Sequence, residues 1–125
     1  MNVPDELRYA LSDEWAKVEG DVVTLGVTDY AQHELGEIVY VELPQIGDNV
    51  SSGTSFGVVE SVKAVAELMS PVDGEVIASN AALPDDPSLI NESPFEKGWM
   101  IRVCVTDAAP LEQLMDADAY REYRD

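Results

Sequence analysis

Positive charge is scarce in this chain of 125 residues, which has 7 Lys and Arg against 25 Asp and Glu and a net charge of −18. Nucleic acids and anionic bilayers would repel such a chain, because clustered basic side chains are what binds phosphate. We therefore expect neither nucleic acid nor a membrane as partner. The acids are dispersed along the chain, which is typical of proteins from salt-rich cells, where ions screen carboxylate repulsion. The composition thus favours an acidic, halophilic protein.

Cysteine and histidine are almost absent. Cys104 is the only cysteine and His33 the only histidine. An internal disulfide is therefore impossible, which fits a reducing cytoplasm, and a metal site built from several Cys or His is excluded. A serine or cysteine triad would depend on His33 alone as its base. We expect no metal site and no catalytic residues.

Long hydrophobic runs and targeting signals are also missing. No segment approaches the roughly 18 apolar residues of a membrane span, and residues 1–6 resemble neither a secretory signal nor a transit peptide. Hydrophobic residues nevertheless make up 46% of the chain, enough for a core. No linker or low-complexity stretch divides the sequence, so residues 1–125 are expected to form a single domain.

Alternating apolar residues and turn signals predict short antiparallel strands through most of the chain. The expected strands are Glu14–Val18, Asp21–Val27, Glu37–Leu43, Ser55–Ser61, Val65–Ser70, Glu75–Ala78 and Trp99–Thr106. A short helix is expected between Thr28 and Gly36, further helices after Ala109 and Asp116, and a long loop over residues 80–98. This pattern predicts a mainly β fold, a small barrel or sandwich with a short internal helix and a helical C-terminus.

Several residues are given specific places by this interpretation. Ile38 and Tyr40 are expected on one face of their strand, and Gly74 in a turn where it is free to take a positive φ. Cys104 is expected to pack as a small hydrophobic residue. His33 is expected on the surface of the internal helix.

Lys63 is the only basic residue between Lys17 and Lys97. It lies between two predicted strands, so it would stand with Val62 and Ala64 at the tip of a hairpin. A lysine in that position buries nothing and is usually only a solvated turn residue. It would also be open to a modifying enzyme.

The segments around this lysine resemble the lipoyl-attachment region of the H-protein family of the glycine cleavage system. Those segments are Glu60–Ala64, Glu67–Pro71 and Gly74–Val76. Further blocks follow the family's order along nearly the whole chain: Ser12–Trp15, Gly26–Thr28 with Ala31, Leu35–Gly36, Val41–Pro44, Leu89–Asn91 with Ser93–Pro94, and Gly98–Ile101. The resemblance implies a barrel-sandwich hybrid like that of lipoyl domains, with lipoic acid joined to Lys63 by an amide. Biotin carriers typically have Met on both sides of the lysine, whereas Val62 and Ala64 stand here.

The same resemblance implies a non-catalytic carrier that serves several enzymes. In the family, the P protein (glycine decarboxylase) loads an aminomethyl group onto the lipoyl arm, and the T protein (aminomethyltransferase) transfers it to tetrahydrofolate. The L protein (dihydrolipoyl dehydrogenase) then reoxidises the arm. A lipoylating enzyme would be a fourth partner, and Glu60 is the candidate for its recognition. An arm of about a dozen single bonds reaches roughly 10–15 Å.

The loaded arm folds back against the protein in this family, and Ser12, Glu14 and Glu67 are the matching positions here. A carboxylate is the appropriate partner for a protonated amine. Many family members have His where this chain has Asp13, and some have His where it has Glu34.

Two other functions fit the same residues. The chain could be a relay that donates lipoyl groups to 2-oxoacid dehydrogenases, a role that would survive deletion of the other cleavage-system proteins. It could instead be an unmodified acidic β-domain that binds partners, in which case the intact mass would show no lipoyl group on Lys63.

Overall fold

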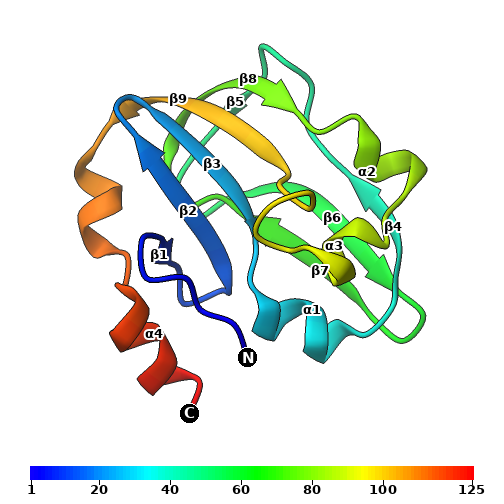
Figure 1. Ribbon diagram of the computed structural model, residues 1–125. Coiled ribbons are helices and arrows are strands. Elements are labelled where there is room, and N and C mark those ends of the chain that lie inside the picture. The colour runs from blue at the N-terminus through cyan, green and yellow to red at the C-terminus, as the bar shows by residue number, and fades with distance from the viewer.

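The computed structural model describes residues 1–125 as two antiparallel sheets packed face to face (Figure 1). The strands are β1 (Arg8–Tyr9), β2 (Glu14–Glu19), β3 (Val22–Val27), β4 (Ile38–Glu42), β5 (Asn49–Val50), β6 (Ser55–Ser61), β7 (Val65–Met69), β8 (Asp73–Ser79) and β9 (Ile101–Asp107). The helices are α1 (Asp29–Leu35), α2 (Ala82–Asp85), α3 (Leu89–Glu92), a 3₁₀ turn at Ala109–Gln113, and α4 (Ala117–Tyr123). The predicted mainly β fold with an internal helix and a helical C-terminus is confirmed.

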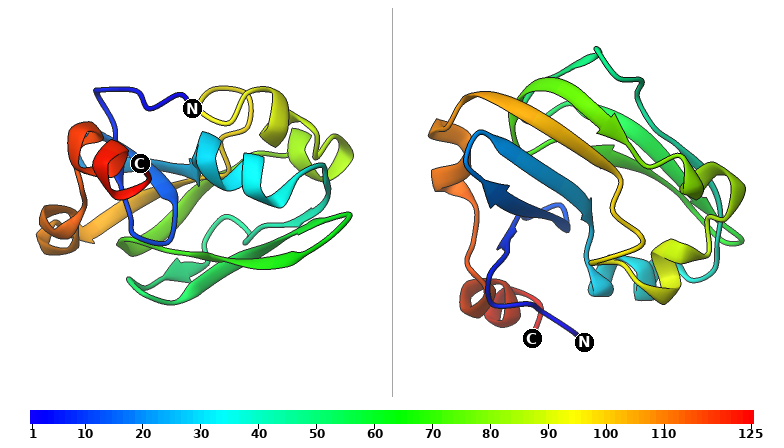
Figure 2. Two further views of the ribbon diagram at one scale, coloured as in Figure 1. Left: turned by 90° about the horizontal axis from the view of Figure 1, so that it is seen from below. Right: turned by 45° about the horizontal axis from the view of Figure 1, so that its top comes forward.

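Six strands form the larger sheet, in the order β1-β2-β3-β9-β8-β5, and three form the smaller one, in the order β4-β6-β7. Figure 2 shows the two sheets as layers, with α1 beside the end at which β3 leads into β4. The layers enclose one cluster of 18 buried hydrophobic residues, to which both sheets contribute. None of the helices is long and apolar enough to cross a membrane.

A second, smaller core lies between β1, β2 and α4. Its six buried residues are Val3, Leu7, Tyr9, Trp15, Ala117 and Tyr120. The rings of Tyr9 and Tyr120 stack with their centroids 4.6 Å apart, a geometry that adds to the area they bury. This cluster fixes the C-terminal helix against the large sheet.

Helix α1 begins and ends as the sequence predicts. The hydroxyl of Thr28 accepts a hydrogen bond from the Ala31 amide, so Thr28 is the N-cap. Gly36 ends the helix at φ +79°, a conformation that favours glycine. The Gln32 side chain donates to the Asp29 carboxylate at 2.7 Å within the first turn of the helix.

The prediction that Ile38 and Tyr40 share one face of β4 is wrong. Ile38 and Val41 are the buried residues, whereas Val39 and Tyr40 are exposed. The register with β6 shifts between Ile38 and Tyr40, so a bulge inserts one residue and moves Tyr40 away from the core face.

Gly74 and Cys104 also differ from the prediction. Gly74 does not have a positive φ; it lies within β8, where a Cβ would overlap the carbonyl oxygen of Cys104. Glycine is required at position 74 because the backbone of β9 approaches it closely, not because a turn needs a positive φ. The Cys104 side chain is exposed, because its neighbours Ile101 and Val103 alternate onto the core face of β9.

The segment 80–98, expected to be a loop, holds the one-turn helices α2 and α3. Each places a single side chain in the core, Leu83 from α2 and Ile90 from α3. Two strands of two residues, β1 and β5, were not predicted because such short segments show no periodicity.

Candidate functional site

Lys63 lies at the tip of the β6–β7 hairpin, as predicted, and its side chain is exposed. The hydroxyl of Ser61 forms the turn: it accepts hydrogen bonds from the amides of Lys63 (3.3 Å) and Ala64 (3.0 Å). The Ser61 amide donates to the Ala64 carbonyl at 2.8 Å. Neither Val62 nor Lys63 has a positive φ, so a serine turn replaces the primed turns usual in short hairpins.

The tip of the hairpin is fixed to the body of the protein. The Val62 amide donates to the Glu37 carbonyl at 3.2 Å. On either side of Glu37, the Asn91 side chain accepts from the Ile38 amide (2.9 Å) and donates to the Gly36 carbonyl (2.8 Å). The hairpin therefore has a set position relative to α1 and α3.

The Lys63 side chain passes beside Gly36. A Cβ built on this glycine would lie 3.5 Å from Cε of Lys63 and 4.0 Å from its Nζ. The salt bridges of the structure involve only Arg121 and Arg124. The Lys63 amine is thus exposed and has no carboxylate partner, which is the arrangement that an amide-forming enzyme needs.

Glu14 and Ser12 lie together. Glu14 is only 2% exposed, and one of its carboxylate oxygens accepts a hydrogen bond from the Ser12 hydroxyl. The other accepts from the Met69 amide of β7 at 3.1 Å. Burial is the main cause that raises the pKa of Glu14 to about 7, and the two hydrogen bonds oppose it.

Glu67 lies on the same strand as Met69 and is exposed. Strand β7 is an edge of the small sheet, so this edge faces the Glu14 carboxylate without a further strand between. Four residues of extended chain separate Lys63 from Glu67, a span of about 13 Å. Glu67 is therefore within reach of an arm on Lys63, and Glu14 meets the strand two residues further on.

Glu60 stands close to the tip as well. It is half-buried on β6, where it is paired with Tyr40 of β4 and Val65 of β7. The structure thus places the attachment candidate, the docking candidates and the recognition candidate along one hairpin and the start of β2.

Comparison with known proteins identifies the family. The family model described as "Glycine cleavage H-protein" matches residues 7–125. The chain belongs to this family.

Its relatives match it almost from end to end. The glycine cleavage system H protein of Staphylococcus saprophyticus is 54% identical over 122 residues, which are 98% of this chain and 97% of the relative. The H protein of Halalkalibacterium halodurans is 55% identical over 121 residues, which are 97% of this chain and 94% of the relative. A crystal structure of the H protein from Mycobacterium marinum matches with a TM-score of 0.90, 34% identity and 98% coverage of both chains.

Membership confirms three of the predictions. The chain is the lipoyl carrier of the glycine cleavage system, it has no catalysis of its own, and its fold is the lipoyl-domain hybrid. The other components of that system are its partners by the same family assignment. No group of three or more His, Cys, Asp or Glu lies close enough together to hold a metal ion.

Sequence reasoning missed the network that supports the loop with Ser12 and Asp13. Asp13, the residue between Ser12 and Glu14, has a φ of +74°. Its carboxylate accepts two hydrogen bonds from Arg124, at 2.9 and 2.6 Å, and one from the Tyr120 hydroxyl at 2.8 Å. These contacts from the C-terminus hold the strained backbone of the loop. The only sign of this network in the sequence is that Asp13 stands where many family members have His.

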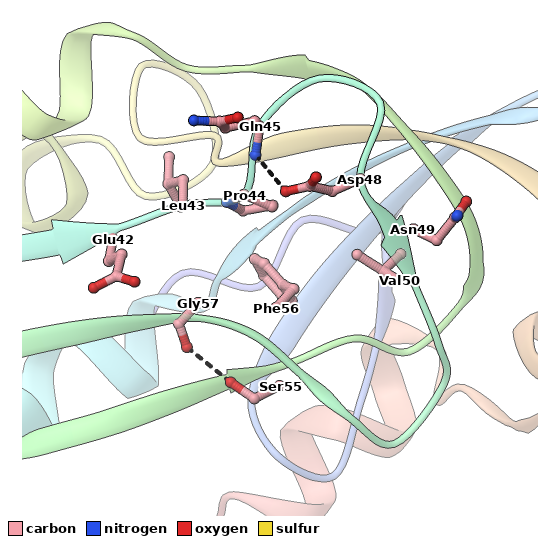
Figure 3. Close-up of a pocket in the computed structure, with 10 residues that line it drawn as sticks. All are labelled: Glu42, Leu43, Pro44, Gln45, Asp48, Asn49, Val50, Ser55, Phe56 and Gly57. Carbon is pink, nitrogen blue, oxygen red and sulfur yellow. Dashed lines mark hydrogen bonds between the residues drawn. The ribbon is translucent and has the colours of Figure 1, made fainter.

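The largest hollow of the protein is a separate feature (Figure 3). It has a volume of about 540 Å³ and lies between the end of β4, β5 and the start of β6. Its lining near Ser55 and Gly57 lies at the end of the hairpin opposite the Lys63 tip.

Proposed function

We propose that Lys63 carries the lipoyl group as an amide, and that the protein passes an aminomethyl group from the P protein to the T protein before the L protein reoxidises it. The observation that supports this most is the Lys63 amine itself, which is exposed at a fixed hairpin tip without an ion pair. When bound, the lipoyl group supplies a disulfide for carbon–sulfur and redox chemistry. A tether on a fixed tip keeps that group at a high local concentration for each enzyme it visits.

We propose that Ser12, Glu14 and Glu67 hold the end of the loaded arm. The carboxylates of Glu14 and Glu67 offer negative charge to the protonated amine of the cargo. Because Glu14 is almost wholly buried, an ion pair with it would be screened far less by water than a surface pair. The approaching cation would also lower the pKa of Glu14 from about 7 and favour the carboxylate. The hydrogen bond from Ser12 keeps that carboxylate oriented.

Three further proposals concern the protein in the cell. Glu60 is the proposed recognition residue for the lipoylating enzyme, because it lies three residues before Lys63 and remains partly accessible. Residues 1–125 are proposed to act as a single carrier domain in a reducing cytoplasm. The dispersed acids, 25 in all, are proposed as an adaptation to high salt.

The attachment site is tested by replacing each lysine separately. The chain has three lysines, so Lys17→Arg and Lys97→Arg are matched controls for Lys63→Arg. The lipoylating enzyme should modify both controls as it does the native protein and leave Lys63→Arg without added mass. Glycine cleavage with the other components should be lost only in Lys63→Arg. Modification of Lys63→Arg would refute the assignment.

The docking residues are tested on lipoylated protein. Glu14→Gln, Glu67→Gln and Ser12→Ala should release the loaded aminomethyl group to water faster than native protein, with the largest change in Glu14→Gln. Lipoylation itself should be normal in all three. Glu60→Ala should show the reverse pattern, slow lipoylation and normal cargo retention, and normal lipoylation would contradict its assigned role.

A further inference from the structure

Three of the seven basic residues converge on one hollow on the outer face of the large sheet. This cationic hollow has a volume of about 440 Å³, within the range of small-molecule sites. It is lined by Trp15, Lys17, Glu19, Thr24, Phe95, Glu96, Lys97, Trp99 and Arg102. In a chain with a net charge of −18, such a gathering of cations requires an explanation.

The sheet register brings two of these cations to either side of a threonine. Lys17 of β2 is paired with Thr24 of β3, and Thr24 is paired with Arg102 of β9. Two strand spacings separate Lys17 from Arg102, about 10 Å. Because both side chains are long, an anionic group placed over Thr24 is within reach of both.

The side chains of the three cations and of Thr24 donate no hydrogen bond to the rest of the protein. The ammonium groups of Lys17 and Lys97 and the Arg102 guanidinium take no part in the salt bridges, which belong to Arg121 and Arg124. Thr24 is only 6% exposed, yet its hydroxyl makes no hydrogen bond within the protein. No fully enclosed side-chain oxygen is unpaired anywhere in the structure, so this hydroxyl must open into the hollow. Buried polar groups are normally paired, so the unpaired hydroxyl of Thr24, beside three exposed cations, indicates an absent acceptor.

The aromatic walls are held in place. The Arg102 guanidinium lies over the Trp99 ring, 4.3 Å from its centroid, and the indole NH of Trp15 donates to the Pro94 carbonyl at 2.9 Å. The Trp15 and Phe95 rings pack with centroids 6.0 Å apart. The hollow therefore offers apolar surface beside its cations without needing to rearrange.

We propose that the cationic hollow binds a small organic anion, a carboxylate or phosphate attached to an apolar or ring-shaped part. The anionic group would lie over Thr24 between Lys17 and Arg102, and the apolar part would lie on the aromatic walls. Two acids, Glu19 and Glu96, also line the hollow, so the three cations leave a local excess of positive charge. The repulsion between a bound anion and most other carboxylates is screened by salt, since the Debye length is about 8 Å at physiological salt.

This site is separate from the arm. The residues next to its strand members, Ala16, Val23 and Val103, point into the core between the sheets. The hollow is thus on the face of the large sheet that turns away from the small sheet and its Lys63 hairpin. The proposal goes beyond the carrier function and does not depend on lipoylation.

The test is a titration of the unlipoylated full chain followed by amide NMR shifts and tryptophan fluorescence. Both tryptophans of the chain line the hollow, so their fluorescence is a probe of this site. Phenyl phosphate and benzoate combine an anion with a ring, inorganic phosphate lacks the ring, and benzyl alcohol lacks the charge. At least one of the first two should bind about tenfold more tightly than both of the others, with shifts at Thr24, Trp99 and Arg102. Equal affinity of all four, or no shifts there, would overturn the proposal.

Variants locate the binding. Arg102→Gln and Thr24→Val should each weaken binding of the better probe about five- to tenfold, whereas Arg8→Gln, the same charge loss elsewhere on the large sheet, should not. Circular dichroism checks that each variant is folded. If Thr24→Val does not fold, Lys17→Gln, a change at an exposed position, replaces it. Native affinity in both Arg102→Gln and Lys17→Gln would refute the site. Native affinity in Lys63→Gln would leave this proposal intact even if the lipoyl assignment failed.

Discussion

Replacing Glu14 with Gln should make the protein more stable at alkaline pH while impairing its function. Glu14 is 2% exposed, and burial raises its pKa from 4.5 to about 7. Glutamine has the same shape and keeps both hydrogen bonds, because its carbonyl can accept from the Met69 amide while its amino group donates to the Ser12 hydroxyl. Only the ionisation is removed.

The sign and size of the effect follow from the pKa. A raised pKa means that the folded state holds a proton that the unfolded state releases between pH 4.5 and 7. The stability contributed by the protonated group is complete below pH 4.5 and is lost as the pH rises through 7. At 1.36 kcal/mol for each pKa unit, the carboxylate costs about 3 kcal/mol of folding free energy at pH 8.

Urea unfolding of native protein and Glu14→Gln from pH 4 to 8 measures this cost. The two proteins should be similarly stable near pH 4, and the variant should gain up to about 3 kcal/mol by pH 8. The difference between them cancels the titration of the other 24 acids. Equal stability of the two proteins at pH 8 would refute the burial argument. The same variant should lose cargo fastest, so stability and retention would change in opposite directions.

The remaining predictions concern the supporting structure and the surface charge. Arg124→Gln should cost about 2 kcal/mol in urea unfolding, because it leaves Asp13, whose side chain is 16% exposed, without its charged partner; unchanged stability would show that the pair contributes nothing. Gly74→Ala should cost about 1–3 kcal/mol, because its Cβ would overlap the Cys104 carbonyl, and a native melting temperature would contradict that close approach. The melting temperature should rise from low to molar KCl as ions screen the net charge of −18; no rise would rule out the high-salt adaptation.

Local features of the fold could be predicted because their causes lie in neighbouring residues. The ends of α1 follow from Thr28 and Gly36, and the β6–β7 hairpin follows from two apolar runs on either side of Lys63. The bulge in β4 could not be predicted from its own residues, since it arises from pairing with β6. Short elements such as β1 offered no period to detect.

The candidate site was predictable only in part, and chiefly through the family resemblance. The residue types at Ser12, Glu14 and Glu67 suggested docking, but nothing local showed that Glu14 is buried. In the fold this carboxylate meets the amide of Met69, 55 residues away along the chain. The cationic hollow was beyond sequence reasoning for the same reason, because strand register alone brings Lys17 and Arg102 to one face.

Lys63 is the lysine proposed to carry the lipoyl group. Intact mass and peptide mapping of the protein isolated from its own host test this assignment most directly. One lipoyl mass is expected, on the peptide that contains Lys63, with Lys17 and Lys97 unmodified. A host protein that is unmodified while glycine cleavage is active, or that is modified on either of the other two lysines, would contradict it.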